Sequence, residues 1–263
     1  MLKIIRKFET KIQVGNGFWL DFTLKTPIKT KNRFLELNSI ANFYSENPET
    51  QKKDRYPQNN LPSINLIGSQ FQLYVSEYSI NTAIFTFLTE KSKPLSFRVG
   101  TKILNSMLPG IVDKYGEKQA TVTLIQSPNS NVKITDQYFG INVPGTLSIK
   151  VDGITNEILN CNLDLSLKVD IIVNYQNMQN YVTGNIKELS AKVKEVKVNE
   201  VSKSDISFIE SGFKFIDFTV IKLLNEFIKN NFLFSVPPIM GVTLINIKFI
   251  HKNGYFEVNY DIK

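Results

Sequence analysis

The 263-residue sequence contains a single cysteine and a single histidine, and this scarcity excludes several classes of function. Cys161 has no partner in the chain for a disulfide, and its place in an alternating apolar segment indicates a core side chain. A Ser-His-Asp or Cys-His arrangement would have to use His251, which lies beside a turn and is interpreted as a polar strand residue. One histidine and one cysteine also provide no recognisable metal-binding set. The sequence therefore predicts neither an enzyme nor a metal or cofactor site.

Long apolar segments are also missing. The most apolar stretch, residues 208–234, is interrupted by charged side chains, so no segment reaches the roughly 20 apolar residues that cross a bilayer. The first ten residues lack the apolar run and small-residue cleavage site of a secretory signal peptide. These features predict a soluble chain, at most peripheral to a membrane. They leave open an intracellular protein or a fragment of a longer secreted precursor.

The formal net charge of +7 predicts attraction to anionic surfaces, but the lysines are scattered along the chain. Most of them alternate with apolar residues, a pattern typical of solvated strand faces. No basic stripe with neighbouring aromatic residues indicates nucleic-acid binding. Two loose basic groups in loop-like sequence are suited to contact anionic headgroups. They are Lys25, Lys29, Lys31 and Arg33, and Lys52, Lys53 and Arg55.

Alternation of apolar and polar residues dominates the sequence and predicts long antiparallel strands, each with one solvated face. The clearest example runs from Cys161 to Val173, where apolar residues occupy every second position. Residues 242–250 and 255–262 flank a turn that contains Asn253-Gly254, which predicts a terminal β-hairpin. Residues 47–66 contain three prolines and few apolar side chains, and are interpreted as a linker.

Two segments follow the 3.6-residue period of an α-helix instead. Residues 69–90 predict a helix with two apolar sides, which must be covered on both. One arc contains Phe71, Tyr74, Val75, Tyr78, Thr82 and Phe85, and the other contains Leu73, Ile80, Ile84 and Phe87. Residues 211–231 predict a surface helix with one broad apolar face, and Lys214, Lys222, Asn225 and Lys229 lie on its polar face. A short helix at 102–115 is expected to be interrupted by Pro109-Gly110.

Three motifs occur in a recognisable order. Residues 42–47 (NFYSEN) precede the proline-containing stretch, and residues 73–83 (LYVSEYSINTA) combine helical apolar spacing with small polar residues. Residues 234–242 (FSVPPIMGV) precede the terminal hairpin. This order resembles the C-terminal half of the family of bactericidal/permeability-increasing, lipopolysaccharide-binding and cholesteryl-ester-transfer proteins, which belongs to the tubular lipid-binding superfamily.

The resemblance implies an α+β tubular lipid-binding fold. A strongly bent antiparallel sheet would wrap around the long helix at 69–90, with a second long helix and the C-terminal hairpin beside it. It also implies a lipid-binding or lipid-transfer domain of innate-immunity type, which encloses the acyl chains of a phospholipid-like ligand in an apolar tunnel. The expected lipid-binding residues are Phe71, Val75, Tyr78, Thr82, Phe85, Ile216, Val220, Leu224 and Phe227. The arc of Leu73, Ile80, Ile84 and Phe87 remains the alternative lining, and a structural or interaction protein without lipid remains the alternative function.

The same resemblance divides the chain into three parts. Residues 1–46 correspond to strands of a central sheet, residues 47–66 to a linker, and residues 67–263 to a lipid-binding barrel. The family's first barrel, with its basic tip, has no counterpart here, so lipopolysaccharide binding is not implied. A partner barrel, in a longer precursor or in another protein, is expected, together with peripheral contact with anionic membranes. Secretion or a secretory-pathway location is expected on the same ground.

Overall fold

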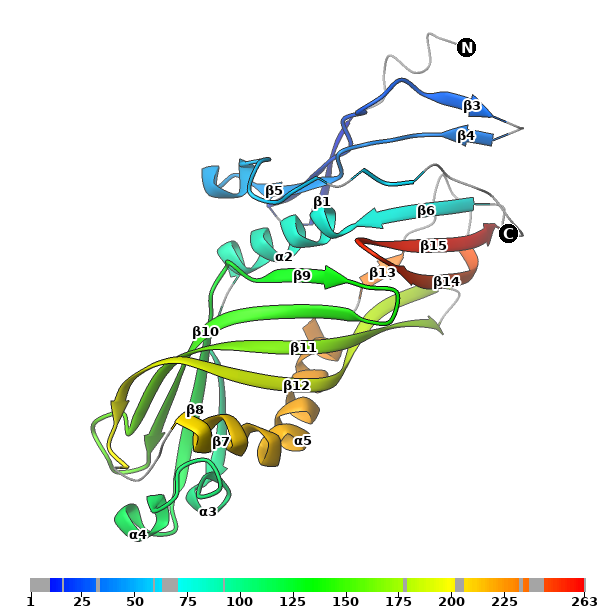
Figure 1. Cartoon of the computed structure of the whole chain (residues 1–263). Helices are drawn as coiled ribbons and strands as arrows, with labels where there is room; N and C mark the ends of the chain where they lie inside the picture. The colour runs from blue at the N-terminus through cyan, green and yellow to red at the C-terminus, as the bar shows by residue number, and fades with distance from the viewer. Residues whose placement is uncertain are drawn as a thin grey trace.

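The computed structural model describes residues 10–15, 17–31, 34–58, 60–62, 71–91, 93–176, 179–201, 206–231, 234–236 and 244–262. These residues form an elongated molecule in which several antiparallel sheets follow one another along the long axis (Figure 1). The N-terminal strands lie at one end, and the short helices α3 (Thr101–Leu104) and α4 (Ile111–Tyr115) lie at the other (Figure 1). None of the helices in the described ranges is long and apolar enough to cross a membrane.

A seven-stranded antiparallel sheet forms the body of the molecule. Its order is β13-β12-β11-β10-β8-β7, and β9 pairs with β10. The strands are β7 (Leu95–Gly100), β8 (Gln119–Gln126), β9 (Asn131–Ile134), β10 (Phe139–Val151), β11 (Leu159–Gln176), β12 (Gln179–Asn199) and β13 (Phe234–Val236). The alternating segment that begins at Cys161 lies within β11, as its period predicts.

The two faces of β11 and β12 differ in the way that the alternation predicts. Cys161 is fully buried, and burial raises the pKa of its thiol to about 11, so the interpretation as a core residue is confirmed. On the other face, Lys168 pairs with Glu188 at 2.7 Å and Lys187 with Asp170 at 3.3 Å. These lysines therefore lie on solvated strand faces, where exposed ion pairs contribute little to stability.

Three smaller sheets make up the rest of the β structure in the described ranges. One has the order β1-β2-β5 and a second pairs β3 with β4. Their bounds are β1 (Lys11–Gly15), β2 (Phe18–Asp21), β3 (Lys29–Lys31), β4 (Phe34–Glu36) and β5 (Asn42–Ser45). The third has the order β14-β15-β6, with β6 (Phe71–Ser76), β14 (Leu244–Lys252) and β15 (Tyr255–Ile262). The strands β14 and β15 form the terminal hairpin, and Gly254 has a φ of +85° in its turn.

The remaining helices are η1 (Pro48–Gln51), α2 (Glu77–Lys91) and α5 (Ile206–Asn231). The helix expected at residues 102–115 is divided into α3 and α4 on either side of Pro109-Gly110, as predicted. The helix expected from residue 211 begins five residues earlier, at Ile206.

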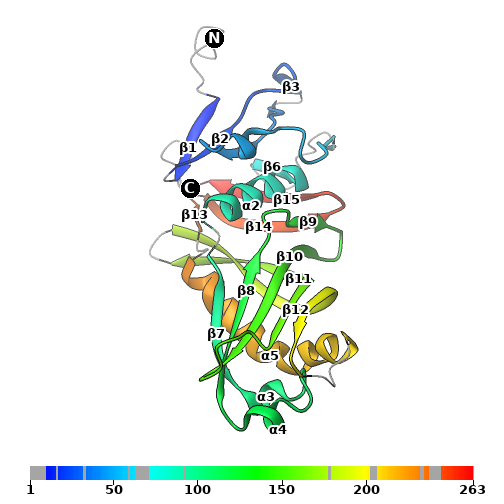
Figure 2. The same ribbon diagram turned by 90° about the vertical axis from the view of Figure 1, so that its left-hand side faces the viewer.

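The expected α+β fold is wrong. The protein is mostly β, with 52% of its residues in strands and 21% in helices, and it has several separate antiparallel sheets. The helix predicted for residues 69–90 does not form as one element, because residues 71–76 form β6 and pair with β15. No sheet wraps around α2, which lies between the N-terminal strands and β9 (Figures 1 and 2).

The physical reason for this error lies in the sequence of β6 itself. Phe71, Leu73 and Val75 recur at every second position, which fits a strand, whereas Phe71 and Val75 are four residues apart and also fit one face of a helix. Pairing with β15 satisfies the backbone of this segment and stacks Phe71 on Tyr260, with ring centroids 5.4 Å apart. Tertiary pairing therefore decides between two patterns that the sequence alone leaves equivalent.

Irregularities in β12 determine where α5 packs. The register of β12 against β11 shifts at Lys187, Lys194 and Lys197, so each of these lysines is an extra residue in the ladder. The Val193 N–H beside one bulge donates to Glu210 Oε1 on α5 at 2.8 Å. Beside the bulge at Lys187, Asn225 on α5 bonds both backbone groups of Ile186, at 2.7 and 3.1 Å.

The spacing of these contacts matches on the two elements. The fifteen-residue separation from Glu210 to Asn225 spans about 23 Å in an α-helix, and the seven-residue separation from Ile186 to Val193 spans about the same distance in a strand. The helix therefore runs antiparallel to β12 and is bonded to it near both ends of its path (Figure 2). The sequence assignment of Asn225 to the solvated face of this helix is wrong, because the side chain is partly buried against β12.

The main apolar cluster fills the space between α5, the seven-stranded sheet and the α3–α4 segment. Twenty buried residues form it in the described part of the chain, including Leu108, Ile149, Leu163 and Ile209, all at most 1% exposed. Gly212 allows α5 to approach closely, since a Cβ there would lie 2.3 Å from Met107 Cα. This cluster supplies a large apolar area that folding removes from water.

Replacing Asn225 by Ala should destabilise the protein by about 2–4 kcal/mol, because a buried donor and acceptor of Ile186 lose their partner. Urea denaturation would measure this change. Replacing the exposed Lys222 on the same helix by Ala is the control and should change stability by less than about 0.5 kcal/mol. Equal effects of the two substitutions would contradict the role of Asn225.

Candidate functional site

Side chains of α2 bind the backbone of β9. Asn81 Oδ1 accepts from Val132 N–H at 2.6 Å, and Asn81 Nδ2 donates to Val132 O at 3.4 Å. One turn earlier, Glu77 Oε1 accepts from Ile134 N–H at 2.5 Å. Residues four apart lie on one side of a helix, so this side of α2 satisfies the backbone of an edge strand.

The opposite side of α2 binds β5. Thr82 Oγ1 accepts from Phe43 N–H at 3.1 Å, and Thr86 Oγ1 donates to Phe43 O at 3.2 Å. Ser45 Oγ donates to Glu90 Oε1 at 2.7 Å. The small polar residues of the 73–83 motif thus have a structural role, because they connect α2 to strands of two separate sheets.

A buried polar group lies next to this interface. The Tyr78 hydroxyl donates to Asn42 Oδ1 at 2.9 Å, and burial together with the charge of Asp21 raises the pKa of Tyr78. Asp21 is 2% exposed and accepts from Lys53 Nζ at 2.7 Å and from Thr23 N–H at 2.8 Å. Burial alone would raise the pKa of Asp21, but these hydrogen bonds outweigh it and hold the pKa below its usual value.

A second apolar cluster lies where α2, α5, the terminal hairpin and strands β9 to β12 meet. Its buried members are Val132, Ile134, Phe139, Val169, Ile186, Phe256 and Val258. Twelve partly buried apolar residues surround them in the described ranges. They are Val75, Ile80, Ile84, Ile141, Leu167, Ile171, Ile221, Leu224, Ile228, Ile247, Phe249 and Tyr260. Gly184 on β12 lies beside this cluster, and a Cβ there would meet Val169 Cγ1 at 3.1 Å and Ile228 Cγ2 at 3.8 Å.

The residues expected to bind lipid are distributed over several environments. Val75 and Leu224 both pack against the second apolar cluster. Phe71 is 42% exposed and lies on β6. The side chains of Ile216, Val220 and Phe227, all on α5, lie outside the described residues.

The stripe of Tyr78, Thr82 and Phe85 packs against protein. Tyr78 and Thr82 bind residues of β5, as described above. Phe85 is 5% exposed, and the guanidinium of Arg55 lies 3.9 Å from its ring centroid. In the alternative arc, Ile80 and Ile84 pack against the second apolar cluster.

Sequence reasoning did not assign Ile141, Ile171, Ile247 or Phe249 to a site. The alternation of apolar and polar residues in their strands indicates that these side chains face inward. It does not indicate which inward-facing side chains are completely buried and which are only partly buried. The cluster also brings together elements far apart in the chain, and such contacts leave no local signal.

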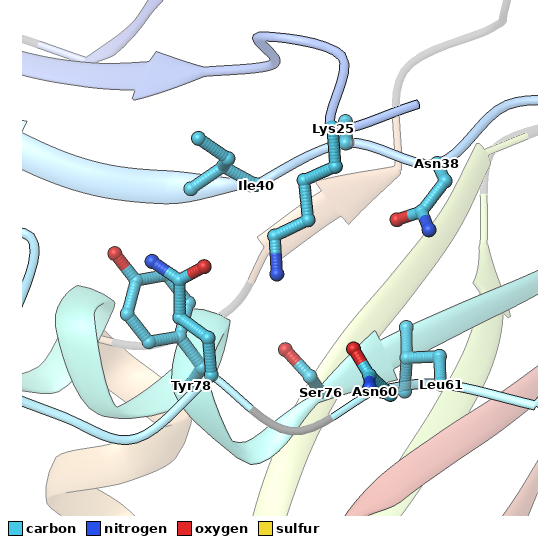
Figure 3. Close-up of a pocket in the computed structure, with 9 residues that line it drawn as sticks. Lys25, Asn38, Ile40, Asn60, Leu61, Ser76 and Tyr78 are labelled. Atoms are coloured by element: carbon cyan, nitrogen blue, oxygen red, sulfur yellow. The ribbon is translucent and has the colours of Figure 1, made fainter. Parts of the chain in front are cut away.

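A small polar cavity of about 150 Å³ lies at the β6–α2 junction, where Ser76 and Tyr78 line it. Lys25 extends into it toward Ser76 and Tyr78, with Asn38 and Asn60 at its side (Figure 3). The complete lining is Lys25, Asn38, Ser39, Ile40, Gln58, Asn60, Leu61, Ser76 and Tyr78. Within the described ranges, no group of three or more His, Cys, Asp or Glu side chains is placed to share a metal ion.

The loop cations differ in their partners. Lys52 and Arg55 both bind Glu49, at 2.8 and 3.2 Å, and Lys53 binds Asp21. No carboxylate in the described ranges forms an ion pair with Lys25. The side chains of Lys31 and Arg33 lie outside the described residues.

The sequence matches no family model and no curated protein. Among solved structures, the fold is similar to one described as the crystal structure of a lipopolysaccharide binding protein, with 12% sequence identity and a TM-score of 0.44. The similarity covers 97% of this chain and 56% of the other, so the chain spans just over half the length of that protein. At this level of similarity, function has to be inferred from the chain's own side chains.

Replacing Lys53 by Met should destabilise the protein by about 1–3 kcal/mol at pH 7, because Asp21 remains buried without its cation. The folded-state pKa of Asp21 is lowered, so the stabilisation is present above the unfolded-state pKa near 3.9 and is lost as the pH falls through the folded-state value. The difference from the wild type, measured by urea denaturation, should therefore shrink below about pH 4.

The matched control is Lys52→Met, since Lys52 forms an exposed ion pair with Glu49. This control should change stability by less than about 0.5 kcal/mol at either pH. A Lys53→Met effect that is the same at pH 7 and pH 3 would contradict the assigned ion pair.

Proposed function

We propose that the protein binds the acyl part of a long-chain lipid at the second apolar cluster. The observation that carries this proposal is the incomplete burial of the cluster. Within the described residues, the second cluster has seven buried and twelve partly buried members. The main cluster has twenty buried and eleven partly buried members in the same ranges. An apolar surface that stays partly open inside a fold is where an apolar ligand gains most from burial.

The energy of such a site depends on area. Each CH₂ group removed from water contributes about 0.8 kcal/mol, so a chain of about 16 carbons contributes on the order of 10 kcal/mol before ordering costs are subtracted. No charged or catalytic side chain is required for this contribution. The branched side chains of Ile84, Ile171 and Ile228 supply the matching apolar surface from three different elements.

The contacts favour the alternative arc of α2 as the ligand-facing side. Tyr78, Thr82 and Phe85 are occupied by contacts with residues 42–55, so they have little surface left for a ligand. Ile80 and Ile84 point toward the partly open cluster. We therefore propose Ile84 and Ile171, rather than Tyr78, as the residues that contact an acyl chain.

The net charge supports a further part of the proposal, namely that the ligand is exchanged at anionic membranes. Each basic residue near such a surface contributes about 1 kcal/mol, and salt screens this attraction. The contact is therefore peripheral, and transfer of a lipid between membranes is the activity that it suits.

Filling the cluster should prevent lipid uptake. Replacing Ile171 by Trp should lower the binding of a fluorescent phospholipid at least fivefold, because the larger ring occupies space that the acyl chain needs. Lipid extraction and mass spectrometry of the purified wild-type protein should find near-stoichiometric lipid, and less in the variant.

The matched control is Ile154→Trp, because Ile154 is partly buried against the main cluster instead. This control should bind lipid within twofold of the wild type. Absence of both co-purified lipid and uptake in the wild type would contradict the proposal and favour a structural or interaction protein.

A further inference from the structure

The cavity at the β6–α2 junction is chemically unlike the second apolar cluster. At about 150 Å³ it has room for roughly five water molecules, which is too small for an acyl chain. Seven of its nine lining residues have polar side chains, and no lining residue is a carboxylate. A small polar group therefore suits this space, and the absence of lining carboxylates makes it favourable for an anion.

Lys25 gives the cavity its charge. Its ammonium group extends into the space between Asn60, Ser76 and Tyr78 (Figure 3). Asp21, a buried carboxylate four residues earlier in the chain, is already bound by Lys53 and Thr23. The positive charge of Lys25 is thus not neutralised by an ion pair within the described ranges.

Side chains around Lys25 supply hydrogen-bond donors. The amides of Asn38 and Asn60 and the hydroxyl of Ser39 line the same cavity, while the amide of Gln58 is hydrogen-bonded to Tyr78. An ammonium group with several amide and hydroxyl donors is the set of groups that binds a tetrahedral oxyanion, because each oxygen can accept from a different donor.

We propose that this cavity binds a phosphate group, held by Lys25 and the surrounding amides. Neighbouring residues of β6 and α2 separate the cavity from the second apolar cluster, since Val75 packs in the cluster whereas Ser76 lines the cavity. The proposal is therefore independent of lipid binding at the cluster. The phosphate group belongs either to free phosphate or to the headgroup of a phospholipid.

Calorimetric titration with inorganic phosphate and with glycerol 3-phosphate tests this site on the full chain. Glycerol 3-phosphate has the headgroup chemistry of a phospholipid without acyl chains, so failure of the apolar cluster cannot affect the result. At least one probe should bind with 1:1 stoichiometry, more weakly as salt rises. Tighter binding of glycerol 3-phosphate indicates a headgroup site, and tighter binding of inorganic phosphate indicates a site for the free ion.

Two substitutions in the cavity should weaken binding. Lys25→Gln removes the cation and should raise the Kd at least tenfold. Asn60→Asp places a negative charge in the lining at almost unchanged size and should have an effect at least as large. Both side chains belong to exposed residues, so folding should be preserved, and the urea midpoint of each variant verifies this.

The control is Lys29→Gln, since Lys29 is an exposed lysine of β3 outside the cavity. It should keep the Kd within twofold of the wild type. The proposal is overturned if neither probe binds with 1:1 stoichiometry, if either cavity variant binds like the wild type, or if Lys29→Gln weakens binding as much as Lys25→Gln. The last result would assign the binding to general surface charge.

Discussion

The arrangement of the sheets depends on hydrogen bonds between side chains of α2 and strand backbones. Glu77 and Asn81 bind β9 of the seven-stranded sheet, while Thr82 and Thr86 bind Phe43 of the N-terminal sheet. The same helix continues directly from β6, so it is also covalently part of the hairpin sheet. Backbone groups of a strand that are buried without a partner cost free energy. The side chains of α2 provide partners for the backbones of two strands, β9 and β5.

A related constraint positions α5. Two of the three bulges of β12 interrupt its ladder at Lys187 and Lys194, and backbone groups beside them bond Asn225 and Glu210 on the helix. Apolar packing alone would allow α5 to slide along the strand, because branched side chains fit several registers. Two polar contacts with matching spacing on helix and strand leave one register.

The regular strands were predictable from the sequence, and the irregular ones were not. The period of two from Cys161 onward identifies β11, and Asn253-Gly254 identifies the hairpin. In β12 the extra lysines change the apolar spacing to three, from Ile186 to Leu189 and from Val193 to Val196, so the period breaks. For β6, helix and strand patterns coincide, and only its partner β15 decides between them. The apolar character of α2 could be predicted, but the composition of the second apolar cluster could not, because Ile171 and the hairpin reach it through long-range packing.

The two apolar clusters differ in how completely their members are buried. Twenty buried residues form the main cluster in the described ranges, and their burial stabilises the fold. Polar contacts also position the walls of the second cluster: Asn81 bonds β9 on one side, and Asn225 on α5 bonds β12 on the other. A cluster whose walls are positioned by hydrogen bonds does not have to close to keep the fold intact. Its apolar surface can therefore remain partly open, and this is the condition that the proposed lipid site requires in the absence of its ligand.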